Sequence, residues 1–138
     1  MRKLFALYVV FFLLFLNAHK ASAGQCCSDL LIVMQKFLDS DALAPYWHND
    51  VFPERVPLSV TLPVGHENIG PCLKKFGRPV RYQIEISSEQ SFVIHSIFEE
   101  PSYIQIEFSY AVEGLLGEVK YTKQQGEWYE DTVRLVEK

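Results

Sequence analysis

The stretch that decides the fold covers residues 80–136 and reads VRYQIEISSEQSFVIHSIFEEPSYIQIEFSYAVEGLLGEVKYTKQQGEWYEDTVRLV. Apolar and polar residues alternate along it, and short polar segments containing glycine or proline interrupt the alternation. Because successive side chains of a strand point to opposite faces, this pattern is typical of half-buried strands joined by tight turns. It predicts strands at residues 80–86, 92–98, 103–113, 118–124 and 127–136.

Three turns, each placed independently, give one consistent pairing of the first four strands. With two-residue turns after the first and second strands, His95 lies opposite Tyr82 on one side and Ile106 on the other. With a four-residue turn after the third strand, Tyr110 lies opposite Tyr121. These residues then share one face of the sheet, which predicts a continuous apolar surface that another layer must cover.

The last hairpin, at Gln125–Gly126, allows two pairings. A two-residue turn sends Trp128 to the apolar face. A turn with a one-residue bulge instead sends Asp131, Val133 and Leu135 there. We prefer the bulge, because valine and leucine are better core residues than the polar residues that the first pairing would bury.

An amphipathic helix precedes the strands and can cover them. Its apolar positions follow the spacing of one helical face, at Leu30, Leu31, Val33, Met34, Phe37 and Leu38. Ser28 is placed to cap the helix, which we expect to end near Asp39. The sequence thus predicts an α+β fold, with this N-terminal helix and shorter helices packed on a curved antiparallel meander of four to five strands.

The region between this helix and residue 80 gives weaker signals. Residues 45–53 are aromatic and irregular. Residues 56–62 resemble a strand, but Pro57 argues against one in the middle of a sheet. Gly70–Pro71 predicts the start of a short helix, which Gly77 would end.

Residues 1–23 have the pattern of a secretory signal peptide. Arg2 and Lys3 precede an unbroken apolar run at residues 4–16, and Ala21–Ser22–Ala23 follows. This predicts a mature single domain at residues 24–138 that is exported to the periplasm or the extracellular space, with no stable membrane span after cleavage. An uncleaved anchor and a lipidated cysteine remain as alternatives.

The charge of the chain excludes one class of partner. The formal net charge is −4, and the first 23 residues hold three basic residues and no acid. The remaining 115 residues therefore carry 10 basic and 17 acidic side chains, a net charge of −7. Nucleic-acid binding needs clustered Lys and Arg, so we expect no nucleic-acid partner.

Three cysteines follow the predicted signal peptide. Adjacent cysteines rarely pair with each other, because the small ring strains the peptide bond between them. Cys72 is therefore expected to pair with Cys27, with Cys26 as the alternative partner. There is no Cys-x-x-Cys motif and no histidine cluster, so the sequence predicts no metal site and no cofactor.

The order of elements resembles the NTF2-like and cystatin-like α+β superfamilies. The hairpin at 121–128 carries the Lys-x-x-Gly-x-Trp pattern common there. Residues 76–80, with Glu113–Gly114 and residues 126–128, are also similar to cytochrome oxidase assembly factor 1-type domains. The resemblance covers residues 71–136 and implies helices packed into a curved sheet. A cystatin-type inhibitor loop would need glutamine where this chain has Tyr110.

Enzymes of the NTF2-like type place catalytic groups in the cone between helix and sheet. In the predicted pairing His95 lies on the apolar face beside Tyr82, and the bulge would turn Asp131 toward it. A buried imidazole paired with a carboxylate suits proton abstraction or activation of water. The alternative is that His95 fills space and bonds a neighbouring oxygen.

Other residues suggest a binding surface. Tyr46, Trp47 and His48 form an aromatic-polar loop that could anchor an interface, and Trp128 could do the same. Alternatively, the aromatic rings fill one end of the core. An acidic rim could steer a basic partner, and its candidates are Glu99, Glu100, Glu127, Glu130 and Asp131.

The pattern therefore favours a small exported, non-catalytic domain that binds another protein. An NTF2-like enzyme or small-ligand binder is the alternative.

Overall fold

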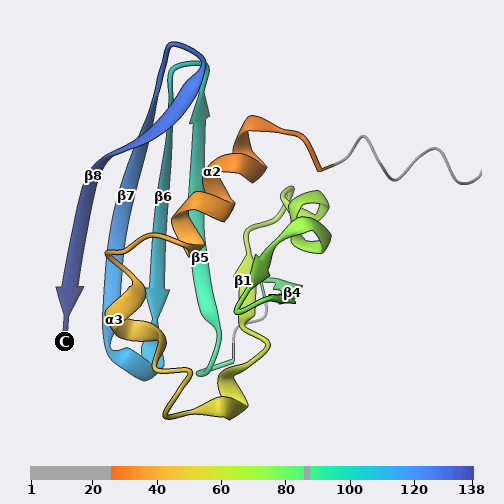
Figure 1. Cartoon of the computed structure of the whole chain (residues 1–138), viewed down its shortest axis with the longest axis vertical. Coiled ribbons are helices and arrows are strands. Elements are labelled where there is room, and N and C mark those ends of the chain that lie inside the picture. The colour runs from red at the N-terminus through yellow and green to blue at the C-terminus, as the bar shows by residue number, and fades with distance from the viewer. Residues whose placement is uncertain (1–25, 86–87) are drawn as a thin grey trace, which may run out of the picture.

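The computed structural model describes residues 26–85 and 88–138 as a mixed α+β fold, with a six-stranded sheet and few helices (Figure 1). The helices are α2 (Asp29–Leu38), α3 (Ala44–Trp47), η1 (Pro53–Arg55), η2 (Glu67–Cys72) and η3 (Ala111–Glu113). The strands are β1 (Ser59–Leu62), β2 (Lys74–Lys75), β3 (Arg78–Pro79), β4 (Arg81–Ile84), β5 (Phe92–Glu100), β6 (Tyr103–Tyr110), β7 (Leu115–Gln124) and β8 (Glu127–Glu137). The predicted signal peptide lies outside the described residues. Within them, no helix has the length and apolar character needed to span a bilayer.

The sheet contains more strands than the sequence predicted, in the order β4-β1-β5-β6-β7-β8. Strands β5 to β8 form an antiparallel meander, whereas β1 lies between β4 and β5 and runs parallel to both. The prediction of four to five strands was wrong because Pro57 does not interrupt β1. The strand starts two residues later, at Ser59, and buries Val60 and Leu62 completely.

The predicted hairpin between residues 80–86 and 92–98 was also wrong. Strand β4 pairs with β1, so Tyr82 lies beside Val60 and not beside His95. The ring of Tyr82 packs against Gly70 of η2. The helix predicted to start at Gly70–Pro71 was wrong as well, because η2 starts earlier, at Glu67, and ends at Cys72, after which the chain forms the two-stranded hairpin β2–β3.

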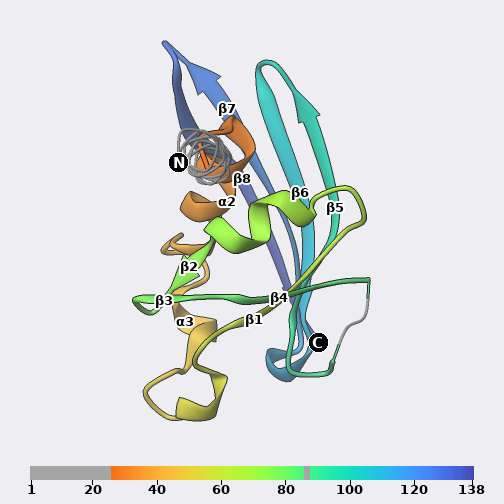
Figure 2. The same cartoon turned by 90° about the vertical axis from the view of Figure 1, so that its right-hand side faces the viewer.

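One face of the sheet is covered by α2, and the sheet curls around this helix (Figure 2). The hydroxyl of Ser28 accepts a hydrogen bond from the Leu31 amide at 3.2 Å and so caps the helix. All six apolar positions of the predicted stripe are buried. The ring of Phe37 packs edge-on against Phe108, with centroids 4.8 Å apart, and contacts Phe92 at 5.7 Å.

A bulge in β5 changes which residues face the helix. Ile94 pairs with Phe108, and Ser96 pairs with Glu107, so His95 is an extra residue between them. The added residue shifts the alternation by one position between the two halves of β5. Ile94, before the bulge, therefore points into the core, and His95 points into solvent. The predicted pairing of His95 with Ile106 was therefore wrong, and Ile97 occupies that position.

A second bulge lies in β8, at Asp131. The hairpin closes with Gln124 opposite Glu127, so Trp128 is buried, as a two-residue turn requires. Beyond the bulge, Val133 lies opposite the buried Val119 and packs against the core. Each alternative pairing therefore holds for one half of the strand, and the prediction that Asp131 turns inward was wrong.

The pairing of β6 with β7 differs from the prediction, but the faces do not. Tyr110 lies opposite Leu115, and Tyr121 lies opposite Ile104. The predicted register is wrong by an even number of residues, which leaves each side chain on its face. Both tyrosines are consequently buried.

The disulfide joins Cys26 to Cys72, with the two Cα atoms 5.7 Å apart. Cys27 is free and exposed. The preferred prediction of a Cys27–Cys72 bridge was wrong, and the alternative partner forms the bond. Sequence spacing could not separate two neighbouring cysteines, because only the direction in which each side chain leaves the chain distinguishes them.

Candidate functional site on the uncovered face of the sheet

The three residues predicted for catalysis lie far apart in the sheet. His95 is exposed, and its Nε2 lies 2.7 Å from the hydroxyl of Ser109. Asp131 is exposed on β8, at one edge of the sheet, and Tyr82 lies on β4, at the other edge, with 41% of its surface exposed. These residues therefore cannot act together on one substrate, and the interior near them holds packed side chains.

The aromatic residues predicted to bind a partner are divided between core and surface. Trp47 is buried against the rings of Phe92 and Tyr110, with centroids 5.3 and 5.8 Å away. Trp128 is also buried. Tyr46 is half-buried and donates a hydrogen bond from its hydroxyl to Glu137. The tryptophans thus stabilise the fold and are not available as binding platforms.

His48 belongs to an ionic cluster that ties three segments together. Its Nδ1 lies 3.1 Å from Glu113 on η3, and the same carboxylate accepts a hydrogen bond from Arg55 on η1. The guanidinium of Arg55 also lies 4.3 Å from the centroid of the Phe52 ring. Burial raises the pKa of Glu113, but the hydrogen bonds from Arg55 and His48 outweigh it and hold that pKa below its ordinary value.

Replacing Glu113 with glutamine is expected to lower the free energy of unfolding by about 2 kcal/mol at pH 7, because Arg55 then loses its ionised partner. Since the folded-state pKa of Glu113 is lowered, its contribution is present above the unfolded-state pKa and is lost as the pH falls through the folded-state pKa. Urea unfolding of both proteins from pH 7 down to pH 3 should show their stabilities converging in acid. A constant difference across this range would contradict the assignment.

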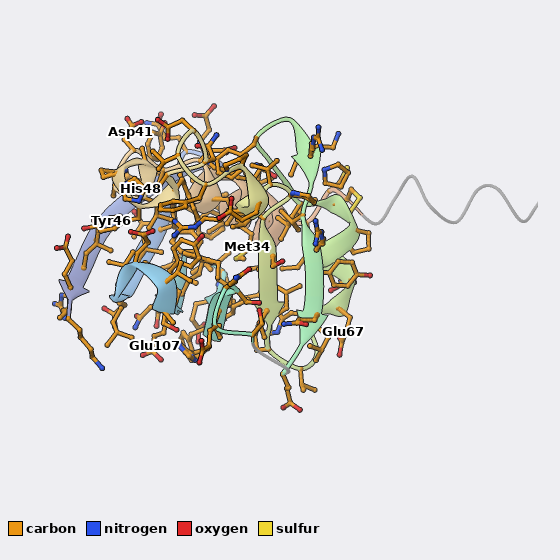
Figure 3. The ribbon with its side chains drawn as sticks, turned by 90° about the horizontal axis from the view of Figure 1, so that it is seen from below. Met34, Asp41, Tyr46, His48, Glu67 and Glu107 are labelled. Atoms are coloured by element: carbon orange, nitrogen blue, oxygen red, sulfur yellow. A yellow bond between two sulfur atoms is a disulfide. The ribbon has the colours of Figure 1, made fainter. Side chains whose placement is uncertain are left out.

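The face of the sheet opposite α2, here called the outer face, has no covering element among the described residues. In Figure 3, Glu107 lies on this side of the molecule, whereas Tyr46 and His48 lie on the helical side and Met34 lies between. Hydrogen-bonded registers arrange the side chains of β5 to β8 in rows across this face. No outward side chain in these rows is buried.

Two neighbouring rows carry the aromatic rings of the outer face. One row consists of Glu100, Tyr103, Thr122 and Tyr129. The next consists of Phe98, Gln105, Lys120 and Thr132. The rings of Phe98 and Tyr103 stack with centroids 5.7 Å apart, and the ammonium of Lys120 lies 4.4 Å from the Tyr103 centroid. Because Phe98 and Tyr129 are about half exposed, at 51% and 48%, this end of the face offers apolar contact area.

The next row is charged and consists of Ser96, Glu107, Glu118 and Arg134. Glu107 lies directly opposite Glu118, an arrangement that is destabilising for like charges. Ser96 donates a hydrogen bond to Glu107 at 2.8 Å, and Gln105 donates one to Glu118 at 3.1 Å. Arg134 lies 3.9 Å from Glu118. These contacts offset part of the repulsion between Glu107 and Glu118, and a positively charged side chain of a partner could offset more.

His95 separates two hollows beside these rows. A hollow of about 490 Å³ opens where β1 leaves β5, and it is lined by Thr61–Val64, Glu85 and Val93–His95. A second, of about 300 Å³, lies over Gly117 and is lined by His95, Glu107, Phe108, Leu116, Glu118, Arg134 and Val136. The outer face is therefore not flat, and it offers both depressions and exposed rings to a partner.

Sequence reasoning missed most of this face. It named Glu100 and Glu127 as candidates for an acidic rim, but it placed His95 on the opposite face and did not single out Glu107, Glu118 or Arg134. The signal was present, because these residues occupy the polar positions of the alternation in 103–113, 118–124 and 127–136. Their neighbours across the strands could be found only once the registers and bulges were known.

No protein-family model matches the chain, and neither a curated protein nor a solved structure matches it. Within residues 26–85 and 88–138, no three His, Cys, Asp or Glu side chains gather closely enough to hold a metal ion.

Proposed function

We propose that this chain is a small exported, non-catalytic domain that binds another protein through the outer face of its sheet, and that the partner's contact surface is basic. The observation that carries this proposal is the outer face itself, where exposed aromatic rings lie beside opposed carboxylates. Exposed rings supply the buried anchors of protein interfaces, and carboxylates select a positively charged surface.

Charge and cysteine chemistry support the two other parts of the proposal. A net charge of −7 after residue 23 would accelerate association with a basic partner, most strongly at low salt. The disulfide between Cys26 and Cys72 supports export, because such bonds persist in oxidising compartments and are rare in the cytosol.

The resemblance to NTF2-like and cystatin-like domains, and to cytochrome oxidase assembly factor 1-type domains, belongs to the same proposal. A helix held in the curve of a largely antiparallel sheet supports it. In this proposal the fold is a scaffold for binding at its surface rather than inside a cone, because packed rings fill the interior around Phe37 and Phe92.

Binding through the outer face is tested with a matched pair of double variants. Glu107→Lys with Tyr129→Ser changes the outer face, and Asp50→Lys with Val51→Ser makes the same kinds of change on exposed residues elsewhere. Lysine at position 107 would face Glu118, so the first variant is expected to fold. We expect it to lose at least tenfold in affinity for the partner, whereas the second keeps the affinity of the wild type.

The partner is identified by chemical crosslinking of the mature protein in an envelope extract at low salt, followed by mass spectrometry. The proposal predicts crosslinks from Lys120 and neighbouring outer-face residues to a basic surface, and these crosslinks should disappear in the first double variant only. Equal capture by wild type and both variants would contradict it, as would crosslinks confined to the helical side.

A further inference from the structure

Strand β5 has two halves with different neighbours. Its first half pairs with β1, but only through Phe92 and Val93. Its second half, Ser96–Glu100, pairs with β6 on one side and has no strand on the other among the described residues. Figure 1 shows β5 continuing well beyond the end of β1. The backbone amides and carbonyls on that side therefore have no strand partner among the described residues.

We propose that this open edge of β5 binds an extended, basic segment of the partner protein as an added strand. The inference rests on the proposed function, which it makes more specific, because it names the kind of partner segment and where that segment lies. Strand addition of this kind gains affinity from main-chain hydrogen bonds and specificity from pockets for alternate side chains.

The geometry of the edge suits such pairing. The bulge at His95 ends before Ser96, and from Ser96 to Glu100 the ladder with β6 is regular. These five residues are about the length of an average strand. Four of them are exposed, and Ile97 is half-buried although its partner Ile106 is fully buried, as expected where a neighbouring strand is missing.

A pocket lies next to the edge. The hollow of about 490 Å³ begins where β1 leaves β5, and Ile94 and His95 form part of its wall. A segment paired with Ser96–Glu100 would pass directly beside this hollow, which could receive one of its side chains. Phe98, half exposed on the outer face, offers a second apolar contact.

Charge determines the chemistry of the segment. Glu85 lines the hollow, and Glu99 and Glu100 stand at the far end of the edge. Among the described residues, the basic side chain in contact with this group is that of His66, whose Nε2 lies 3.6 Å from Glu99. A segment carrying lysine or arginine would meet attractive potential along its length, whereas an acidic segment would be repelled.

The other long edge, β8, is less suited. Its bulge at Asp131 lies in the middle of the strand, where it would interrupt regular pairing with an added strand. Its neighbour β7 pairs with it from Leu115 to Gln124, so no strand diverges from β8 as β1 diverges from β5. Binding at β8 is therefore the alternative outcome that the experiment must detect.

The test uses the disulfide-bonded mature protein, labelled with ¹⁵N, and three synthetic nine-residue peptides. The first alternates lysine and valine, the second replaces every lysine with glutamate, and the third is the first with proline at its centre. We expect the lysine peptide to shift the amide signals of Thr61, Leu62, Val64 and Ile94–Glu100, and to bind at least tenfold more tightly than the other two.

Two variants of the protein serve as a matched pair. Glu99→Lys with Glu100→Lys should weaken binding of the lysine peptide at least tenfold, and Asp50→Lys with Glu54→Lys, equal in charge and exposed elsewhere, should not. Signals that move on β8, or equal binding of the proline peptide, would overturn strand addition at β5. If the peptide fails to bind while crosslinks still depend on Glu107 and Tyr129, this inference falls alone. If those crosslinks are also missing, the proposed function falls with it.

Discussion

Replacing Cys72 with serine is expected to lower the free energy of unfolding by about 4 kcal/mol, the largest loss for any single cysteine of this chain. The bond between Cys26 and Cys72 closes a loop with a sequence separation of 46 residues, and it restricts the unfolded chain accordingly. It also ties the start of α2 to the end of η2, next to the ring of Tyr82 that packs on Gly70. Urea unfolding of the oxidised proteins, monitored by circular dichroism, measures the difference.

Cys27→Ser is the matched control, because Cys27 is free and exposed. This variant should unfold with the midpoint of the wild type, and mass spectrometry of the intact protein should show two hydrogens fewer than the reduced form. A destabilised Cys27→Ser variant beside an unaffected Cys26→Ser variant would contradict the observed pairing. Cys72→Ser is preferred over Cys26→Ser for the main measurement, since Cys27 could replace Cys26 as the partner of Cys72.

Replacing Gly117 with alanine is expected to lower the free energy of unfolding by about 3 kcal/mol. A Cβ at this position would lie 2.4 Å from Cζ of Phe108 and 2.9 Å from a methyl group of Leu135. The Phe108 ring cannot easily retreat, because Phe37 and Phe92 hold it at centroid distances of 4.8 and 5.2 Å. Thermal unfolding of the variant measures the loss.

A second substitution separates this steric conflict from a general intolerance of change in β7. Phe108→Leu alone should destabilise by leaving a cavity, but combined with Gly117→Ala it should cost less than the sum of the two single changes. The coupling between these positions is therefore expected to be favourable and to exceed 1 kcal/mol. Strict additivity of the two changes would show that the added methyl group does not meet the ring.

The two bulges explain why His95 and Asp131 do not face the core as predicted, and the pairing of β4 with β1 explains why Tyr82 lies apart from them, whereas most of the core prediction was confirmed. Alternation in a strand assigns its residues to two faces, and that assignment held for Ile106, Tyr110 and Tyr121 even where the register was wrong. One inserted residue reverses the assignment beyond it. His95 and Asp131 are those inserted residues, so neither lies on the face to which the alternation assigned it.

The position of a bulge depends on neighbouring strands rather than on the strand that contains it. In β5, burial of Phe92 and Ile94 on one side of His95 and pairing of Ile97 with Ile106 on the other satisfy the core only if one residue is skipped. In β8, the buried Trp128 and the core contact of Val133 impose the same requirement. No local pattern of residues marks either site.

By itself the sequence determined that the chain combines an amphipathic helix with amphipathic strands, and that Cys72 bonds a cysteine near residue 26. These features follow from periodicity and composition, which act within one segment. Only the tertiary structure decided that β1 enters the sheet between β4 and β5, that Cys26 forms the bond, and that the outer face unites Glu107, Glu118 and Tyr129. Such features depend on which distant segments become neighbours, and the packing of the whole core selects those neighbours.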